Sequence, residues 1–547
     1  MSALYTEALA WADADPDAAT AEQLRRLVAA AELGDASAQA ELEDAFSGTL
    51  EFGTAGLRAA LGPGPNRMNR VVVSRAAAGL ARWLIAHGHV RSEVVIGYDA
   101  RYNSDVFARD TAEILAGYGL RPLLSATRVP TPLVPFEVGR RGAAAGVVVT
   151  ASHNPPADNG YKVYVGASQI IPPTDGEIAA EIAAVSSMPV AHLPRSSEYE
   201  VLGDELIERY VERAASLVAP EAPRDLAWAY TAMHGVGRAI VDRVVKAAGF
   251  PAAAVVAEQA EPDPDFPTVA FPNPEEPGAI DLCLATARRI NADVAIANDP
   301  DADRCAVAAV IGGQWQMLTG DELGMLLADD ALRSGRDGVY ACSIVSSTAM
   351  SVMAAAHGQR FEPTLTGFKW IGRVPGLAFG YEEAIGYCTD PASVPDKDGI
   401  TALVRVLTLV AGLKAEGKTI ADRLDEIVRT YGLHHTSQLS FRVSDLSIIS
   451  DAMARFRAHP PTELAGEAVE ASDLLDGYQG LPPTDGILVE GPSVRVVVRP
   501  SGTEPKLKCY CQVRLSPGLS ENPDAARVAA AGMMGDVRAD VQAALGL

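Results

Sequence analysis

The sequence predicts a large α/β protein of several domains, and a repeated strand–turn–helix pattern is the main evidence. In segments 93–119, 226–250 and 338–358, a short apolar run enters a small polar turn and precedes an amphipathic helix. The repeats start about 133 and 112 residues apart, a spacing typical of domains rather than of solenoid repeats. The last hundred residues differ, because 493–500 and 506–515 alternate like strands of an antiparallel sheet. We therefore expect three similar α/β domains and a smaller C-terminal α+β domain.

The composition supports a folded, multidomain chain. The 547 residues are 48% hydrophobic and 21% charged, and at roughly 100–200 residues per domain this length predicts large buried cores. Asp and Glu number 70 against 46 Lys and Arg, which gives a net charge of −24. Nucleic acids and anionic membranes attract basic surfaces, so neither is expected as a partner. A small anion held by local cations remains compatible with this charge.

Targeting and cysteine usage indicate a reducing compartment. No stretch approaches 18 consecutive apolar residues, and the N-terminus is acidic where a signal peptide needs a basic head. We therefore expect a cytoplasmic protein without membrane contact. The six cysteines form no C-x-x-C pair and suit reduced core thiols. Cys509 and Cys511 lie on one face of an expected strand, where packing is favoured over metal binding.

The domain boundaries follow the order of the elements. Residues 4–46 have helical periodicity and end near Gly48, which predicts an N-terminal helical lead-in. The Pro- and Ser-rich stretch 186–200 marks a junction. We place the four domains at residues 1–205, 206–315, 316–437 and 438–547.

The segment 146–164 carries the first candidate site. An apolar strand ends in Ser152-His153-Asn154-Pro155-Pro156, and proline cannot continue a central strand, so Ser152 is expected on a loop at the strand end. Asp158-Asn159-Gly160 predicts a tight turn into a second strand that brings Lys162 near the loop. A serine beside a histidine and a lysine could be a nucleophile or a phosphoryl carrier. An ordinary capped turn is the alternative.

Three carboxylates follow a buried strand in the segment 292–310. Asp299, Asp301 and Asp303 alternate, and in an extended segment such residues point the same way. Their mutual repulsion calls for a cation, and hard oxygen ligands suit Mg²⁺. A solvated acidic turn is the alternative, although strand ends are where doubly wound folds place their sites.

Two further segments could bind a phosphorylated, hydroxylated ligand. Glu382 and Glu383 follow a glycine turn and could bracket sugar hydroxyls, while Lys397 could act as a general acid or base. Solvated carboxylates are the alternative. The turn after strand 496–500 offers guanidinium, hydroxyl, backbone N–H and ammonium groups to one phosphate. These groups belong to Arg499, Ser501, Gly502, Thr503 and Lys506. An ordinary Pro-Ser-Gly turn is the alternative.

Two nucleotide-binding patterns are interpreted as coincidences. Residues 412–419 have P-loop spacing, which would indicate an NTPase or kinase, but the surrounding sequence predicts a helix, a short break and another helix. Gly235 and Gly237 open a helix after a strand, but Ile240 occupies the place of the third glycine of a dinucleotide fingerprint.

Taken together, these motifs indicate phosphoryl transfer in a cleft between domains. The chain resembles the α-D-phosphohexomutase superfamily, the phosphoglucomutase and phosphomannomutase enzymes, from FGTAGLR (52–58) to RPSGTEPK (499–506), with four motifs in the family's order. The resemblance implies a heart-shaped arrangement of four domains, the first three sharing an α/β fold. It also implies monomers or homodimers that act on small sugar phosphates.

The resemblance assigns roles to these residues. It implies that Ser152 is a phosphoserine, that Asp299, Asp301 and Asp303 hold Mg²⁺ against its phosphate, and that a sugar bisphosphate such as glucose 1,6-bisphosphate serves as primer and intermediate. Lys397 matches a lysine proposed as general base in glucose-specific members. The residues matching positions around the reacting phosphate are Arg58, His153, Lys162 and Arg304, and those of the sugar-facing loop are Thr366, Gly367 and Lys369.

Departures from the family pattern leave the sugar open. Ala384 stands where glucose-type members often have serine, and Tyr387 where the dual glucose/mannose type has histidine. The EEAIGY…DKDG sequence is more similar to the subgroup with phosphopentomutases and glucose-1,6-bisphosphate synthases. A phosphoglucomutase or phosphomannomutase is the first expectation, while a pentose phosphate and a catalytically silent sugar-phosphate-binding relative are alternatives.

Overall fold

The computed structural model describes residues 2–54, 56–443, 445–500 and 506–547. These residues divide into two compact units. The first contains residues 1–308 and 386–412, and the second contains residues 309–385 and 413–547. Each unit is described separately below.

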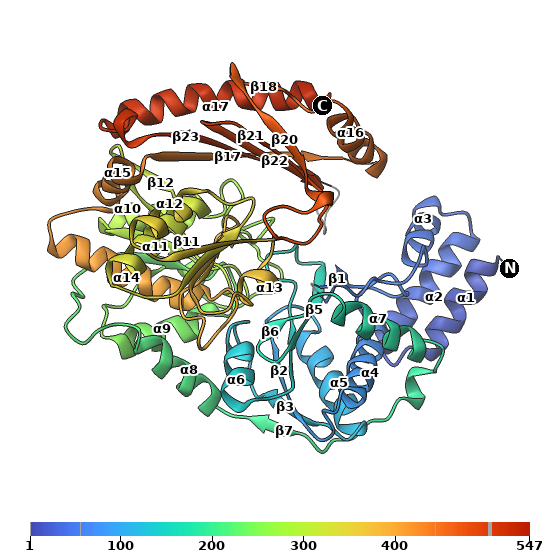
Figure 1. The fold of residues 1–547 in the computed structure, drawn as a ribbon. Coiled ribbons are helices and arrows are strands. Elements are labelled where there is room, and N and C mark those ends of the chain that lie inside the picture. The colour runs from blue at the N-terminus through green and yellow to red at the C-terminus, as the bar shows by residue number, and fades with distance from the viewer. Residues whose placement is uncertain (1, 55, 444, 501–505) are drawn as a thin grey trace. The chain divides into compact units, whose positions relative to one another are not determined.

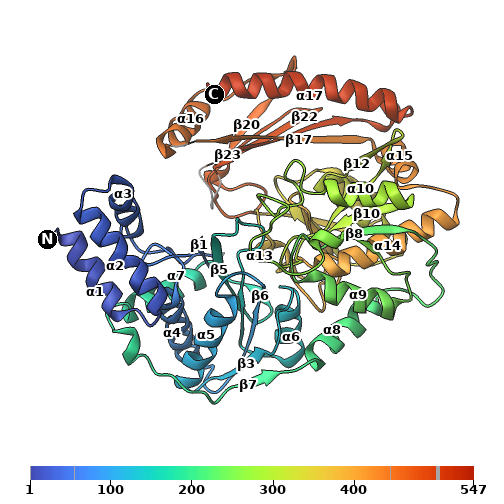
Figure 2. The same cartoon turned by 180° about the vertical axis from the view of Figure 1, so that it is seen from behind.

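The first unit begins with the predicted helical lead-in. It consists of α1 (Ala3–Ala14), α2 (Ala18–Glu32) and α3 (Ala36–Ala45), which pack together in Figure 2. The side chains of Asp17 and Asp35 accept hydrogen bonds from the first turns of α2 and α3, as N-cap residues do. Leu24 and Leu42 are fully buried between the helices. The lead-in therefore has a small apolar core of its own.

A mixed sheet follows, with strands in the order β1-β5-β4-β2-β3-β7 and β6 paired to β5. Its strands are β1 (Leu57–Ala60), β2 (Glu93–Tyr98), β3 (Arg121–Ser125), β4 (Ala145–Val149), β5 (Asp158–Val165), β6 (Ser168–Gln169) and β7 (Glu200–Leu202). The helices of this region are α4 (Arg70–Ala86), α5 (Ser104–Gly117), α6 (Leu133–Arg141), α7 (Thr174–Val185) and α8 (Glu205–Ala215).

Helices cover both faces of this sheet, so its central strands are apolar on both sides. Side chains alternate along a strand, and Val94 and Ile96 of β2 enter the core shared with α4 and α5. On the other face, a Cβ atom on Gly97 would meet Val134 of α6 at 2.6 Å. Figure 1 shows α6 on one side of β2 and α4 and α5 on the other. This layering leaves the strand ends as the open edge for a site.

The predicted turn at residues 158–160 is wrong. Asp158, Asn159 and Gly160 are the first residues of β5, and the turn lies earlier, where the Asp158 N–H donates to the Pro155 carbonyl at 3.1 Å. Gly160 serves close strand approach instead, because a Cβ there would lie 2.5 Å from the Thr150 carbonyl oxygen. Residues that usually form turns thus lie in β5, because the neighbouring strand end approaches too closely for a side chain at position 160.

The second α/β repeat forms a sheet in which β11, β10, β8 and β9 are neighbours in that order. The elements are β8 (Trp228–Thr231), α9 (Gly237–Ala248), β9 (Ala254–Val255), α10 (Asp281–Ile290), β10 (Val294–Ala297) and β11 (Ala306–Ile311). β8 runs parallel to β9 and β10, whereas β11 is antiparallel to β10. The loop between β10 and β11 carries the three predicted carboxylates.

The first unit also contains β16 (Gly386–Cys388) and most of α14 (Gly399–Ala415). Asp398 accepts hydrogen bonds from the backbone N–H groups of Ile400 and Thr401, both at 3.0 Å, and from the Tyr210 hydroxyl at 2.8 Å. This buried carboxyl therefore ties the start of α14 to helix α8.

Besides β12 (Gln314–Met317), the second unit contains the third α/β repeat. The elements of this repeat are α11 (Gly320–Arg333), β13 (Val339–Ser343), α12 (Ala349–Ala356), β14 (Arg360–Thr364), α13 (Phe368–Ile371), β15 (Leu377–Glu382) and α15 (Ile420–Tyr431). β13 is central and runs parallel to β14 and β15. The predicted break between two helices at 412–419 is confirmed, because Thr419 is the N-cap of α15 in a capping box with Asp422.

The C-terminal domain is an antiparallel sheet with helices packed on it, as predicted. The strand order is β17-β23-β22-β21-β20. The elements are β17 (Leu433–Arg442), α16 (Leu446–Ala458), β18 (Glu463–Leu464), β19 (Glu467–Ala468), β20 (Glu470–Asp473), β21 (Ile487–Glu490), β22 (Val494–Pro500), β23 (Lys506–Leu515) and α17 (Pro523–Leu545). Figure 1 shows α17 lying along the sheet.

Both faces of this sheet are buried. Cys509 and Cys511 point into the core with α16 and α17, so their predicted packing role agrees with their burial. On the opposite face, Val497 and Tyr510 pack against Ile344 of the preceding repeat. All six cysteines are buried free thiols. Every helix among the described residues is too short or too polar to serve as a membrane span.

Asp398 should make stability fall as pH rises. Burial raises its pKa from 3.8 to about 6, so the proton is retained in the folded state after the unfolded chain has lost it. This contribution is complete below pH 4 and is lost as pH rises through 6. Between pH 4 and 7, the free energy of unfolding of Asp398→Asn should therefore rise relative to that of the parent, by about 2–3 kcal/mol at most. Thermal unfolding measures this difference.

The control for this experiment is Thr462→Ser, at an exposed position of the C-terminal domain. Neither side chain titrates between pH 4 and 7, so its difference from the parent should not change with pH. A constant difference for Asp398→Asn over the same range would contradict the prediction.

Candidate functional site

The Ser152 loop is held in an unusual backbone conformation. Ser152 follows shortly after β4 ends at Val149, is 2% exposed and has a φ of 53°. A non-glycine residue in this left-handed region costs on the order of 1–3 kcal/mol and persists only where surrounding contacts enforce it. One such contact is the Ser152 N–H, which donates to the Thr150 hydroxyl at 2.9 Å. The strand end therefore presents the serine as predicted, but through a strained residue.

The Ser152 hydroxyl lies between an acid and a base. Its Oγ donates to Asp299 Oδ2 at 3.0 Å and lies 3.2 Å from His153 Nδ1. Burial and the neighbouring Arg304 and Arg58 lower the pKa of His153 well below its ordinary value. The imidazole is therefore neutral near pH 7, so that Nδ1 can accept a proton from the serine.

Asp299, Asp301 and Asp303 converge as predicted, but by a different route. The segment after β10 is a turn in which Ala302 has a φ of 52°, not an extended strand. Their ligand oxygens nevertheless lie within 4.8 Å of one another, and each residue is at most 1% exposed. A compact turn can bring three carboxylates closer than strand alternation would.

The residues of the suspected dinucleotide pattern support this turn. A Cβ atom on Gly235 would lie 2.3 Å from Pro300 Cα, and the Val236 N–H donates to the Pro300 carbonyl at 2.8 Å. Gly235 is thus required for packing against the carboxylate turn, which agrees with the interpretation that the pattern is coincidental.

The donor set fits a hard divalent cation. Asp301 Oδ1 and Asp303 Oδ1 are buried and make no hydrogen bond within the described part of the chain. Burial and the two neighbouring carboxylates raise the pKa of Asp299 well above its ordinary value, so a nearby positive charge would favour the ionised form. Oxygen-only ligands at such a cluster suit Mg²⁺.

Cationic side chains from distant segments surround the cluster. Lys162 Nζ lies 2.7 Å from Asp301 Oδ2 and 2.8 Å from Asp303 Oδ2, and Lys397 Nζ lies 3.5 Å from Asp303 Oδ2. Burial alone would lower the pKa of Lys162, but the two carboxylates raise it, so the ammonium stays charged. Arg304 Nε lies 3.9 Å from both Asp299 and Asp303.

Arg58 belongs to the same site through the serine loop. Its Nη1 donates to Asn154 Oδ1 at 3.1 Å. The structure therefore brings together the predicted residues of the first unit. They are Arg58, Ser152, His153, Lys162, Asp299, Asp301, Asp303, Arg304 and Lys397.

Glu382 and Glu383 lie at the end of β15, and the glycine turn predicted before them is wrong. Gly380 lies inside β15. Glycine is needed there because a Cβ atom would lie 2.4 Å from Ile371 of α13. Glu383 Oε2 accepts from Ser343 Oγ at 3.0 Å and Ser346 Oγ at 3.1 Å. Burial and Asp321 raise the pKa of Glu383. The pair is thus held in place rather than solvated.

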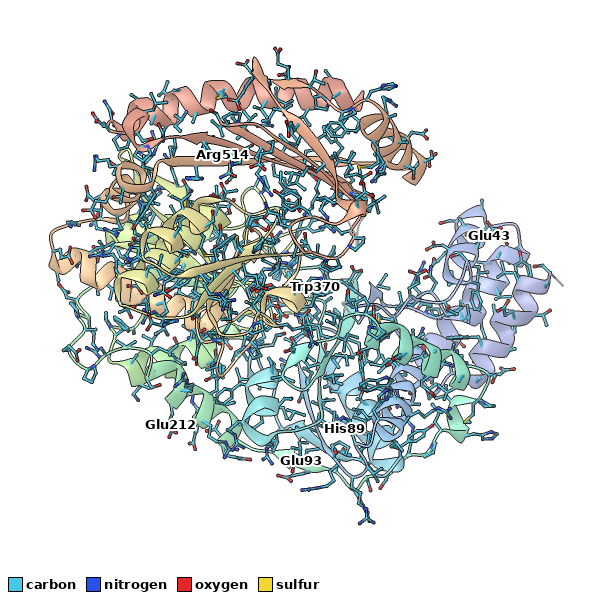
Figure 3. The ribbon with its side chains drawn as sticks, viewed as in Figure 1. Glu43, His89, Glu93, Glu212, Trp370 and Arg514 are labelled. Carbon is cyan, nitrogen blue, oxygen red and sulfur yellow. The ribbon has the colours of Figure 1, made fainter. Side chains whose placement is uncertain are left out.

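The predicted sugar-facing loop leads into a short helix. Gly367 has a φ of 107° and precedes α13, which contains Lys369. Thr366 directly precedes this glycine and is half-buried. Trp370, labelled in Figure 3, packs against the cluster that contains Tyr510. A positive φ before α13 explains why glycine occupies this position.

Only part of the predicted phosphate clamp lies among the described residues. Ser501, Gly502 and Thr503 fall outside them. Arg499 and Lys506 lie on β22 and β23 at either side of that segment. Arg499 hydrogen-bonds the side chain of Tyr510. Burial and the nearby Glu383 raise the pKa of this tyrosine. Tyr510 therefore lies within electrostatic range of both Arg499 and the glutamate pair.

Several contacts were missed at the sequence level. Thr131 Oγ1 donates to Asp301 Oδ2 at 2.6 Å, and the Thr131 N–H donates to the Asp301 carbonyl at 2.9 Å. The Pro-Thr-Pro context of Thr131 suggests a fixed turn, but no pattern points to Asp301. The contacts of Ser346 and Tyr510 could likewise not be predicted from the sequence, since their partners come from other strands.

These features define a multidomain α/β protein with a serine hydroxyl beside a buried carboxylate cluster able to hold a metal. Models of the phosphoglucomutase/phosphomannomutase family match the chain in four consecutive parts. They are α/β/α domain I at residues 49–188, domain II at 208–310, domain III at 319–431 and the C-terminal domain at 455–522. The chain belongs to this family, whose named members are isomerases.

Individual relatives of the chain also carry the names of mutases of this family. A Haemophilus influenzae protein named "Probable phosphomannomutase" is 48% identical over 455 residues, which cover 82% of this chain and 93% of that protein. A human phosphopentomutase is 34% identical over 582 aligned positions, covering 95% of this chain and 92% of that protein. A solved Thermus thermophilus structure described as a "putative phosphomannomutase" has a TM-score of 0.69 at 26% identity, covering 89% of this chain and 99% of that one.

Asp301→Asn should weaken Mg²⁺ binding. The change removes the charge from a buried oxygen ligand while keeping its volume, and we expect a Kd at least about 30-fold higher, or roughly 2 kcal/mol. Calorimetric titration of the chelator-treated protein measures this. Asp329→Asn is a matched control. Asp329 is a buried acid of the second unit, where it pairs with Arg423 of the same unit. Equal Mg²⁺ affinity in Asp301→Asn and the parent would contradict the assignment.

Proposed function

We propose that this chain is a Mg²⁺-dependent phosphosugar mutase. It would move a phosphoryl group between the 1-position and the 6- or 5-position of an aldose phosphate through a phosphoserine at Ser152 and a sugar bisphosphate. The observation that carries the proposal is the position of Ser152 Oγ, 3.0 Å from one of three clustered carboxylates. The family membership supports it.

The first half-reaction phosphorylates the serine. Ser152 Oγ attacks the phosphorus of a bisphosphate and the P–O bond to the sugar breaks. The leaving sugar oxygen takes a proton from the Lys397 ammonium and departs as the alcohol of a monophosphate. Neutral His153, 3.2 Å from Oγ, accepts the serine proton. The ammonium of Lys162 and the guanidinium of Arg58 lie at the same site and would oppose charge on the transferring group. Asp299, Asp301 and Asp303 would hold Mg²⁺, which neutralises phosphate charge when bound.

The second half-reaction returns the phosphoryl group to a different hydroxyl. Either sugar oxygen can attack phosphoserine, so the monophosphate must bind in two orientations. Glu382 and Glu383 would accept hydrogen bonds from sugar hydroxyls common to both orientations. Arg499, Lys506 and the predicted Ser501, Gly502 and Thr503 would hold the phosphate that is not reacting.

The preferred sugar is proposed to be a hexose, with a pentose as the second candidate. Phosphomannomutase is the name of the relative at 48% identity, whereas phosphopentomutase is the name of one aligned over 95% of this chain. Steady-state kcat/KM values for the 1-phosphates of glucose, mannose and ribose decide between them, because discrimination is a ratio of these quantities. Net accumulation of sugar bisphosphate would instead indicate a bisphosphate synthase.

Ser152→Ala should abolish turnover. Without Oγ no phosphoserine can form, so activity should fall by at least about 10⁴-fold, the scale seen when a nucleophile is removed. The assay is interconversion of glucose 1-phosphate with a bisphosphate primer, together with intact mass to detect phosphate on the protein. Ser125→Ala is the control, since it removes another buried hydroxyl of the same domain. Full activity in Ser152→Ala would exclude the mechanism.

A further inference from the structure

Arg101 occupies the centre of the Ser152 loop. It lies between β2 and α5, in the segment Asp99-Ala-Arg101, and its side chain is 1% exposed. Nη2 donates to the carbonyls of Ser152 at 2.7 Å and Asn154 at 2.6 Å. Nη1 donates to the carbonyls of Pro155 at 2.8 Å and Asp158 at 3.1 Å. One guanidinium thus bonds four carbonyls of one loop.

The arginine is itself fixed on its remaining sides. Its Nε lies 3.4 Å from Asp99 Oδ2, and its backbone N–H donates to Asp99 Oδ1 at 2.9 Å. The guanidinium lies over the ring of Phe266 at 5.0 Å from the centroid, a favourable cation–π geometry. Phe266 follows β9 in the second α/β repeat, so the contact joins the serine loop to the domain of the carboxylate turn.

These contacts account for the strained serine. The left-handed φ of Ser152 needs enforcement, and the loop residues 152–158 have few hydrogen bonds of their own. Two of the Arg101 acceptors lie on Ser152 and Asn154, either side of His153. A planar fork with several donors can hold such a set of carbonyls, whereas an ammonium is a single point charge.

We propose that Arg101 is a positioning residue that sets the reactive geometry of Ser152. The guanidinium fixes the backbone of residues 152–158 and so aims Oγ at Asp299, without touching the reacting atoms. Asp99 and Phe266 orient the guanidinium in turn. The inference rests on the proposed function for its kinetic consequences, but the loop geometry can be measured independently.

The kinetic test is Arg101→Lys against Arg195→Lys. Arg195 pairs with Asp110 and Glu113 in the same domain and donates to none of the carbonyls of the Ser152 loop among its described contacts. Arg101→Lys should lower kcat by about 100-fold, the scale expected for a misplacement near 1 Å. The KM for the sugar phosphate and the Kd for Mg²⁺ should stay within about threefold, because the glutamate pair and the three carboxylates are unchanged.

The structural test is amide hydrogen exchange of the intact protein. The N–H groups of Ser152, Asn154 and Asp158 are hydrogen-bonded within the loop, and in Arg101→Lys they should exchange at least about tenfold faster. Arg195→Lys should leave them unchanged. If Arg101→Lys does not fold, Asp99→Asn keeps the volume and removes the charge that orients Arg101, and the same two readouts apply.

The outcomes separate the two proposals. A folded Arg101→Lys protein with parental kcat and parental exchange at residues 152–158 overturns the positioning role. A parent that turns over no sugar phosphate overturns the proposed function, while the exchange measurement still decides whether Arg101 holds the loop. Equal losses of kcat and thermal stability in Arg101→Lys and Arg195→Lys would reduce Arg101 to a general stabilising residue and would also overturn the proposal.

Discussion

The first unit is organised around the mutual repulsion of three buried carboxylates. Their ligand oxygens lie within 4.8 Å of one another, and at an effective dielectric constant near 20 each pair of full charges would repel by about 3–4 kcal/mol. Desolvation adds to that cost. Three side chains offset this cost by contacting the carboxylates. They are Lys162 of β5, Lys397 of the segment before α14 and Thr131 of the loop before α6. Elements far apart in sequence must therefore meet at this one turn.

The same constraint explains why the backbone is strained on both sides of the site. Ser152 and Ala302 have φ values of 53° and 52°, and both lie in turns that follow parallel strands of separate sheets. Strand ends provide the fixed frame, while turns provide the sharp changes of direction that place Oγ next to Asp299. Glycine at 235 and 160 lets neighbouring backbone approach these turns closely enough to support them.

The sequence allowed the elements and the chemistry of the site to be predicted better than its local geometry. Strand ends and helix caps depend on nearby residues, so the loop at Ser152 and the cap at Thr419 were foreseeable. Asp158-Asn159-Gly160 was assigned to a turn because these residues favour turns, but pairing with β1 overrode that preference. The contact of Lys397 with Asp303 joins the segment before α14 to the turn after β10, and no local pattern specifies it.

The distribution of charge explains how an acidic chain can bind the proposed anionic ligand. The net charge is −24, yet Arg58, Lys162, Arg304 and Lys397 set four cations against three carboxylates at the site. A bound divalent cation would make the site clearly positive, which suits a phosphate monoester of about −1.5 to −2. Lys162 pairs directly with Asp301 and Asp303. The same carboxylates would therefore hold the cation beside this lysine, so that both oppose the charge of the phosphate.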